Sequence, residues 1–190
     1  VRFLTNNAWR PRAEYIPFLG SMDIPCTMDE IITSGHLLAR HFIDIGLGGS
    51  TVHVVGGQGL REELRSTANC RLIAGEDPPA QSVVAGIDRE FTYERMRIAQ
   101  QHIFRGARFF CTNRDATFPV EGGGIVPGAG CIVSAIATAA SCEPLNIGKP
   151  NPLGTQLVAK MAGVPLSQTV VIGDRLDTDI EAGVAAGVTT

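Results

Sequence analysis

The chain has 190 residues, of which 44% are hydrophobic and 18% are charged, and its formal net charge at pH 7 is −3. This composition supports one substantial core or two small ones, and the lack of a basic surplus argues against nucleic-acid binding. Its apolar stretches fall far short of the ~20 residues that a membrane span needs, and its first residues carry no signal-peptide pattern, so we expect a cytoplasmic protein that does not bind membranes.

Short apolar runs rich in Val, Ile and Phe alternate along the chain with segments of helical spacing. Strands are predicted at residues 1–4, 51–55, 82–87, 108–111 and 169–172. Helices are predicted between them from the spacing of Ile31, Ile32, Leu38, Phe42 and Ile45, of Leu60 and Leu64, and of Tyr93, Met96, Ile103 and Phe104. This alternation favours an α/β fold with a parallel sheet and crossover helices.

Polar side chains follow three of the predicted strands. These are Thr5-Asn6-Asn7, Thr112-Asn113-Arg114-Asp115 and Gly173-Asp174-Arg175. Ligands of parallel α/β sheets bind beyond the carboxyl ends of the strands, where hydroxyl, amide and carboxylate groups can hold phosphate oxygens or a metal ion. For each segment taken alone an ordinary turn is the better interpretation, because these residue types dominate turns, and only the three together favour a site.

Two glycine clusters divide the chain. Gly46-Leu47-Gly48-Gly49 and Glu121-Gly122-Gly123-Gly124 lie near the two ends of residues 46–126, which we predict to be an inserted domain, with residues 1–45 and 127–190 forming a core domain. Glycine clusters suit hinges, and a two-hinged insertion resembles a lid that closes over a substrate. Two glycine loops within a single sheet are the alternative.

Three segments in this order, Phe3-Leu4-Thr5-Asn6-Asn7, Ile147-Gly148-Lys149-Pro150 and residues 171–180, resemble those of haloacid dehalogenase phosphatases. With Gly86-Ile87-Asp88 and residues 112–119, nearly the whole chain is similar to the subclass of NagD-like enzymes, p-nitrophenyl phosphatases and phosphoglycolate phosphatases. The resemblance implies a Rossmann-like core domain with an inserted α/β cap domain. It also implies magnesium-dependent hydrolysis of a small phosphorylated metabolite through an aspartyl-phosphate.

The same resemblance implies roles for particular core residues. Thr5, Asn6 and Asn7 would bind the phosphoryl group through hydroxyl and amide donors, which stabilise the charge on its oxygens. Lys149 would contact both the phosphate and the nucleophilic carboxylate. Asp174 would be a ligand of Mg²⁺, which prefers carboxylate oxygens and retains several waters, and Asp179 would support the metal site without direct ligation.

In the cap, Asn113, Asp115 and Phe118 are the residues that the resemblance places against the leaving group. Phe118 would give the substrate an apolar face, although packing of this ring in the cap core is at least as good an interpretation.

The first motif of the family, D-x-D-G at the end of a strand, follows none of the apolar runs in these 190 residues. Asp177 and Asp179 form a D-x-D, but they enter a predicted helix, so we do not assign them as nucleophile and acid. We therefore expect a fragment that lacks the first central strand and the last strand, with the nucleophile upstream of Val1 and no turnover from these residues alone.

Two other functions stay open. A non-catalytic module could bind a phosphate ligand with the same residues and lack the nucleophile. Residues 52–59, a strand followed by Gly56-Gly57-Gln58-Gly59, could enter a dinucleotide site, but the third glycine of G-x-G-x-x-G is missing. The sequence leaves open whether the protein is a homo-oligomer.

Overall fold

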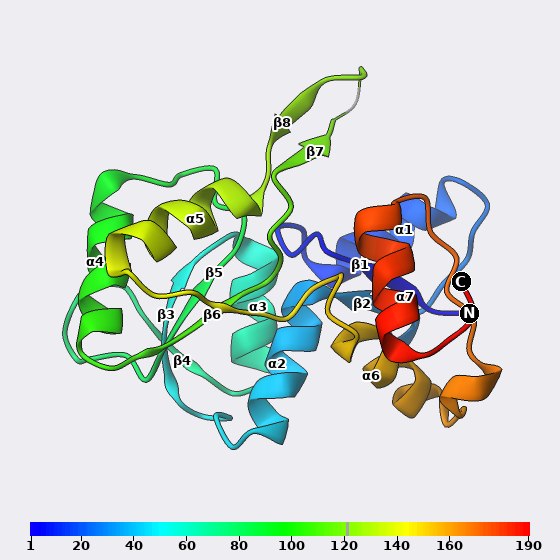
Figure 1. Ribbon diagram of the computed structural model, residues 1–190, viewed down its shortest axis with the longest axis horizontal. Helices are drawn as coiled ribbons and strands as arrows, with labels where there is room; N and C mark the ends of the chain where they lie inside the picture. Colours follow the sequence, from blue (N-terminus) through cyan, green and yellow to red (C-terminus); the bar gives the residue numbers. More distant parts are fainter. Residues whose placement is uncertain (121) are drawn as a thin grey trace.

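The computed structural model describes residues 1–120 and 122–190 and has two lobes (Figure 1). The sheet lobe, on the left in Figure 1, is built on a parallel sheet, and the terminal lobe, on the right, holds both ends of the chain. The predicted α/β fold with a parallel central sheet is confirmed. Within the described residues no helix has the length and apolar character to cross a membrane.

The sheet lobe contains five parallel strands in the order β4-β3-β5-β6-β9. Their side chains alternate between two faces, and each face is covered by two helices (Figure 1). The strands are β3 Thr51–Val55, β4 Arg71–Ile73, β5 Ser82–Ala85, β6 Arg108–Cys111 and β9 Leu145–Asn146, and the helices are α2 Ser34–Asp44, α3 Gln58–Ser66, α4 Tyr93–Phe104 and α5 Ala129–Ala140.

The register explains how these layers pack. Val54, Val84 and Phe110 are direct neighbours across three strands, and all three pack against α2 and α3. The next residue on each strand faces α4 and α5 instead, because successive side chains of a strand point to opposite faces. Burial of apolar side chains on both faces is typical of a parallel sheet within an α/β fold.

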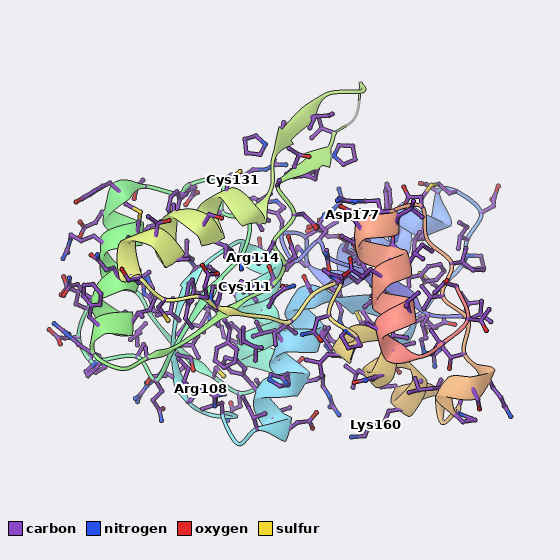
Figure 2. All side chains as sticks on the ribbon, in the orientation of Figure 1. Arg108, Cys111, Arg114, Cys131, Lys160 and Asp177 are labelled. Atoms are coloured by element: carbon purple, nitrogen blue, oxygen red, sulfur yellow. The ribbon has the colours of Figure 1, made fainter. Side chains whose placement is uncertain are left out.

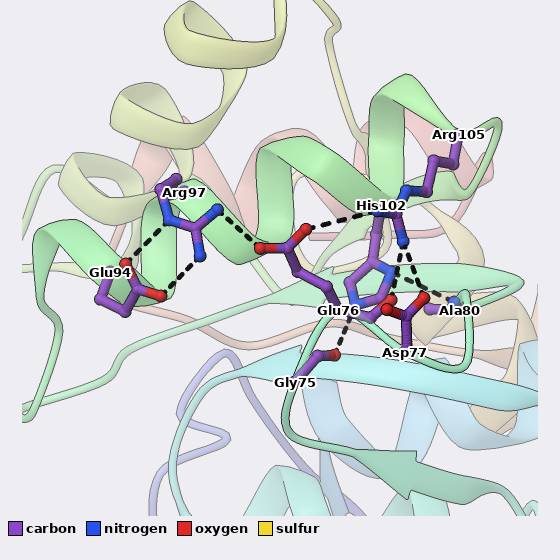
Figure 3. A network of polar contacts seen from close by, with 8 residues as sticks. All are labelled: Gly75, Glu76, Asp77, Ala80, Glu94, Arg97, His102 and Arg105. Atoms are coloured by element: carbon purple, nitrogen blue, oxygen red, sulfur yellow. Dashed lines mark hydrogen bonds and ion pairs between the residues drawn. The ribbon is translucent and has the colours of Figure 1, made fainter.

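Polar contacts attach the loop between β4 and β5 to α4 (Figure 3). His102, fully buried on α4, accepts a hydrogen bond at Nδ1 from Ala80 N (3.2 Å), and its Nε2 lies 3.0 Å from Gly75 O. Glu76 pairs with Arg97 (2.6 Å) and with Arg105 (3.4 Å) on the same helix. These contacts give the loop a fixed position over one end of the sheet.

The terminal lobe is built on two short parallel strands and the helices around them. Ile31 and Ile32, predicted within a helix, belong instead to a strand; α2 begins afterwards, with Thr33 as its N-cap. The elements are β1 Phe3–Thr5, β2 Ile31–Thr33, α1 Tyr15–Gly20, α6 Leu153–Ala162, α7 Glu181–Ala186, the 3₁₀ turns Arg12–Glu14, Met28–Glu30 and Leu166–Gln168, and the π-helical turn Leu176–Ile180.

The prediction of a strand at residues 169–172 is wrong for most of this segment. Only Val170 is paired, through a parallel bridge to Thr189. A strand requires a ladder of hydrogen bonds with a neighbour, and no described residue pairs with the segment on its other side. Ile172 is consequently 94% exposed.

The domain division predicted from the glycine clusters stays a prediction. In the structure, the sheet lobe includes residues before and after the range 46–126. Helix α2 precedes residue 46, and α5 and β9 follow residue 126, yet both helices pack on the five-stranded sheet and β9 is its edge strand. The antiparallel hairpin of β7 Thr117–Pro119 and β8 Ile125–Pro127 projects from this lobe (Figure 1). Glu121, in the second glycine cluster, lies outside the described residues.

Candidate active site

The side chain of Asn6, just beyond β1, connects its own segment with two segments that are distant in sequence, at Asp115 and at Lys149. Its Oδ1 accepts a hydrogen bond from Lys149 N (2.9 Å), and its Nδ2 donates to Lys149 O (3.1 Å). The same Nδ2 donates to both carboxylate oxygens of Asp115, at 3.2 and 3.4 Å. Gly148 permits this contact, since a Cβ there would lie 2.6 Å from Asn6 Oδ1 and 2.1 Å from Thr112 O.

The backbone around Asn6 is fixed by neighbouring side chains. Asn6 O accepts hydrogen bonds from Asn113 Nδ2 (2.8 Å) and Ser34 Oγ (2.7 Å). Asn113 Oδ1 in turn accepts from Asp115 N (3.1 Å). The Thr5 hydroxyl oxygen accepts from Asn7 N (3.2 Å).

The ammonium group of Lys149 points away from that amide pair and toward the last predicted motif. Nζ donates to Asp179 Oδ1 and to Leu4 O (3.2 Å), and the Lys149 and Asp179 side chains are only 14% and 12% exposed. Asp179 Oδ2 accepts from Arg175 N (3.2 Å). The close approach of Asp179 to this loop requires a glycine at position 173, because a Cβ there would lie 2.2 Å from Asp179 Cβ.

The two other aspartates of this motif are exposed. Asp174 lies at the end of residues 169–172 and is exposed to solvent. Asp177 pairs with Arg175 (2.7 Å) and lies in the terminal lobe, in the turn that leads into α7, whereas Cys131 and Arg114 belong to the sheet lobe (Figure 2). Asp177 and Asp179 both lie in the π-helical turn and not directly at the end of a strand.

The predicted residues border two hollows. A cavity is lined by all three predicted cap residues, Asn113, Asp115 and Phe118, together with Asn6 and Asn7. A groove is lined by Lys149 and Asp179, and by Leu4 and residues 169–172. The Asn6–Lys149 amide pair connects the two hollows, while Thr5 and Asp174 line neither.

Trp9 is a residue of the cavity that the sequence interpretation missed. Its backbone oxygen accepts from Gly59 N (2.9 Å), and its ring lies on Gly57, where a Cβ would be 2.3 Å from the ring. A Cβ at Gly59 would lie 2.4 Å from Arg10 O. The glycines at the start of α3 therefore make room for the loop after β1, and the dinucleotide interpretation loses its support, because Trp9 covers this turn.

Burial raises the pKa of the Cys111 thiol to about 12, so this cysteine is a packing residue of β6 in its neutral form.

Comparisons with known proteins agree with this arrangement. A model described as haloacid dehalogenase-like hydrolase matches residues 1–68, and a HAD-hydrolase-like model matches residues 146–190. The 5'-nucleotidase YutF of Bacillus subtilis is 35% identical over 188 residues, which are 99% of this chain and 71% of that protein. The chain belongs to the haloacid dehalogenase-like hydrolases.

Solved structures of this family have the same fold. A putative p-nitrophenyl phosphatase from Bacillus subtilis superposes with a TM-score of 0.89 at 34% identity, covering 98% of this chain and 70% of that one. A glycerol phosphate phosphatase from Mycobacterium tuberculosis in complex with magnesium has a TM-score of 0.90 at 30% identity, covering 98% of this chain and 56% of that one. The predicted resemblance to the phosphatases of this subclass is confirmed.

As a haloacid dehalogenase-like hydrolase, the chain presents a sparse set of metal ligands. The part of the chain that the structure describes has no group of three His, Cys, Asp or Glu side chains able to hold a metal ion. Such a set does not suit Zn²⁺, which takes three or four protein ligands. It fits Mg²⁺, which is commonly held by one or two carboxylates together with waters and substrate phosphates, and Asp174 offers one exposed carboxylate.

Proposed function

We propose that the protein hydrolyses a small phosphate monoester with the help of Mg²⁺, through an aspartyl-phosphate whose nucleophile is not among these 190 residues. The observation that carries this proposal is the double hydrogen bond between the Asn6 side chain and the Lys149 backbone. It brings a polar strand end, a buried lysine and the Asp179 loop to one place, although more than 140 positions separate Asn6 from Lys149 in sequence.

The donors on the terminal lobe suit a phosphoryl group. Thr5 offers a hydroxyl group at the end of β1, and Lys149 carries a positive charge in a largely buried place. A cation in a setting of low dielectric constant attracts a phosphate more strongly than an exposed one does. Donors that are already in place lower the barrier to charge development in the transition state.

Asp179 has a positioning role in this proposal. It accepts the Lys149 ammonium and the Arg175 amide, so it aligns the lysine and fixes the loop that presents Asp174. Asp174 would hold Mg²⁺, which when bound would neutralise charge on the phosphoryl oxygens. The Lys149 ammonium would contact both the phosphate and the nucleophilic carboxylate. Its positive charge would let these two negatively charged groups come close enough to react.

The groove beside Lys149 suits the strand that would carry the nucleophile. Its walls are Leu4 of β1 and residues 169–172, whose backbones lack a ladder partner on the sides that line it, within the described residues. An unpaired strand edge accepts a further strand through backbone hydrogen bonds. A carboxylate at the end of a strand in this groove would lie near Lys149.

A binding module without catalysis remains the second candidate, because the same donors would hold a phosphate whether or not it is cleaved. Joining an apolar strand that ends in D-x-D-G ahead of Val1 separates the two functions. We expect Mg²⁺-dependent hydrolysis of p-nitrophenyl phosphate from this longer chain and none when the first Asp of the added motif is replaced by Asn. A longer chain that binds phosphate without turnover would favour the binding module.

Binding of inorganic phosphate tests the site itself, and the chain has a matched control because Lys149 and Lys160 are its two lysines. We expect Lys149→Gln to weaken phosphate binding, measured by calorimetry with Mg²⁺ present, roughly tenfold or more, as for loss of a charge-assisted hydrogen bond. Lys160→Gln, on the exposed side of α6, removes the same charge and leaves the affinity unchanged. Equal affinities in both variants would contradict the assignment of Lys149.

A further inference from the structure

Arg89 lies in the turn between β5 and α4, flanked in sequence by two acidic residues that are already paired. Asp88, which is buried, accepts from Arg95 Nη1 at 2.7 and 2.8 Å. Glu90 accepts from Arg95 Nη2 at 2.7 Å. Both carboxylates therefore serve Arg95, and in residues 1–120 and 122–190 Arg89 forms no ion pair.

The guanidinium of Arg89 lies over the ring of Trp9, 5.2 Å from the ring centre, and both residues line the cavity that also contains Asn113, Asp115 and Phe118. Trp9 cannot move freely, because its ring rests on Gly57 and its backbone oxygen is bonded to Gly59. A planar cation stacked on a fixed aromatic ring keeps its N–H donors available at the edge. Arg89 is thus an oriented, unpaired cation at the cavity wall.

Among the described residues that line the cavity, Arg89 has the one cationic side chain. Asp115 is the acidic residue of the lining, and its carboxylate is bound by Asn6. Asn6, Asn7 and Asn113 are neutral amides. Gly128 and Ala129 contribute the N-terminus of α5, whose backbone dipole adds a weak positive potential of its own. Ile87 and Phe118 supply apolar wall.

We propose that Arg89 is a specificity-determining residue that selects phosphate monoesters whose alcohol portion carries a second anionic group. The phosphoryl group would bind near Thr5 and Lys149, and the rest of the ester would extend into the cavity, where the second anion meets Arg89 and the spacer meets Ile87 and Phe118. This proposal rests on the proposed function and adds a substrate class to it.

Matched ligand pairs isolate the second charge. Two phosphonates, 3-phosphonopropanoate and 4-carboxyphenylphosphonate, are each compared with their carboxamides, which have the same shape without the charge. Calorimetry with Mg²⁺ gives the ratio of the two dissociation constants in each pair. We expect the carboxylate to bind roughly fivefold more tightly than the amide in at least one pair, the range for a partly exposed ion pair. Propane-1,3-diylbisphosphonate then tells whether a second phosphonate is preferred to a carboxylate.

Three variants test whether this preference comes from Arg89. Arg89→Gln is expected to bring the ratio to about one, and Arg89→Lys to keep part of it. Arg40→Gln removes an equal charge from α2, where the residue lines a different pocket, and is expected to keep the full ratio. Affinity for inorganic phosphate, measured on the same samples, reports whether the phosphoryl site is intact.

The outcomes separate this proposal from the proposed function. Ratios near one for both pairs, with phosphate bound normally, overturn the role of Arg89 and leave the proposed function standing. A preference that persists in Arg89→Gln also overturns it. Failure of the wild-type protein to bind inorganic phosphate overturns the proposed function and this proposal together.

Discussion

His53, in the middle of β3, makes the stability of the fold depend on pH. The side chain is 4% exposed, its Nδ1 lies 3.2 Å from Ile73 O, and its ring centre lies 5.0 Å from that of His102. Its Nε2 is buried and has no partner among the described residues. Burial, and then the neighbouring His102, lower the pKa of His53 to about 4.

The lowered pKa means that the folded protein keeps His53 neutral at pH values where the unfolded chain binds a proton. Stability from this residue is therefore fully present above about pH 6.5 and is lost as the pH falls toward 4. At pH 5, about 1.5 pH units below the unfolded value, the loss is about 2 kcal/mol. This is a large part of the 5–15 kcal/mol, roughly, that holds a typical domain folded.

Urea denaturation at pH 7 and pH 5 measures this loss directly. We expect the free energy of unfolding of the wild-type protein to fall by about 2 kcal/mol or more between the two values, and His53→Gln to remove most of the difference. His41→Gln is the comparison variant. Burial also lowers the pKa of this half-buried histidine, so its contribution has the same sign, but we expect this variant to keep most of the difference between pH 7 and pH 5. If His53→Gln loses as much stability as the wild type on acidification, the assignment is refuted.

Two further predictions concern stability. Glu63 is buried, accepts a hydrogen bond from His36 (2.8 Å) and pairs with Arg12 (2.7 Å). We therefore expect Glu63→Gln to lower the free energy of unfolding by about 3 kcal/mol in chemical denaturation. The control Glu62→Gln changes an exposed residue and is expected to cost less than about 0.5 kcal/mol. Gly59→Ala is expected to cost about 2 kcal/mol by forcing Arg10 O away; Gly75→Ala, with open space around it, is the control, and equal melting temperatures would contradict the steric argument.

Residues whose role depends on short polar motifs were predictable from the sequence. Asn6 follows β1 of the two-stranded sheet, whereas Asn113 and Asp115 follow β6 of the five-stranded sheet, so strand ends identify each of them as a candidate and the contact between the two lobes brings them together. Lys149 was predicted from the resemblance, and the structure adds its contact with Asp179. Their roles in catalysis stay predictions.

Residues that act through the contact between the lobes could not be found in the same way. Trp9 and Arg89 are 80 positions apart and belong to no pattern, and only the folded chain stacks one on the other. The signal that was present was chemical: Trp9 is the single tryptophan and follows the Asn6-Asn7 pair. The packing of α2 and α5 on the five-stranded sheet was likewise not visible in the sequence, because the glycine clusters carry no information about which sheet a flanking helix covers.

The loop of residues 6–12 makes several specific contacts from the terminal lobe to the sheet lobe. Asn6 meets Asn113, Trp9 rests on Gly57, and Arg12 pairs with Glu63. A chimaera that grafts the sheet lobe of a relative onto this protein must therefore carry a compatible loop, although the loop belongs to the other lobe. A sheet lobe without a glycine at the position of Gly57, or without a carboxylate at the position of Glu63, would leave Trp9 or Arg12 without its partner.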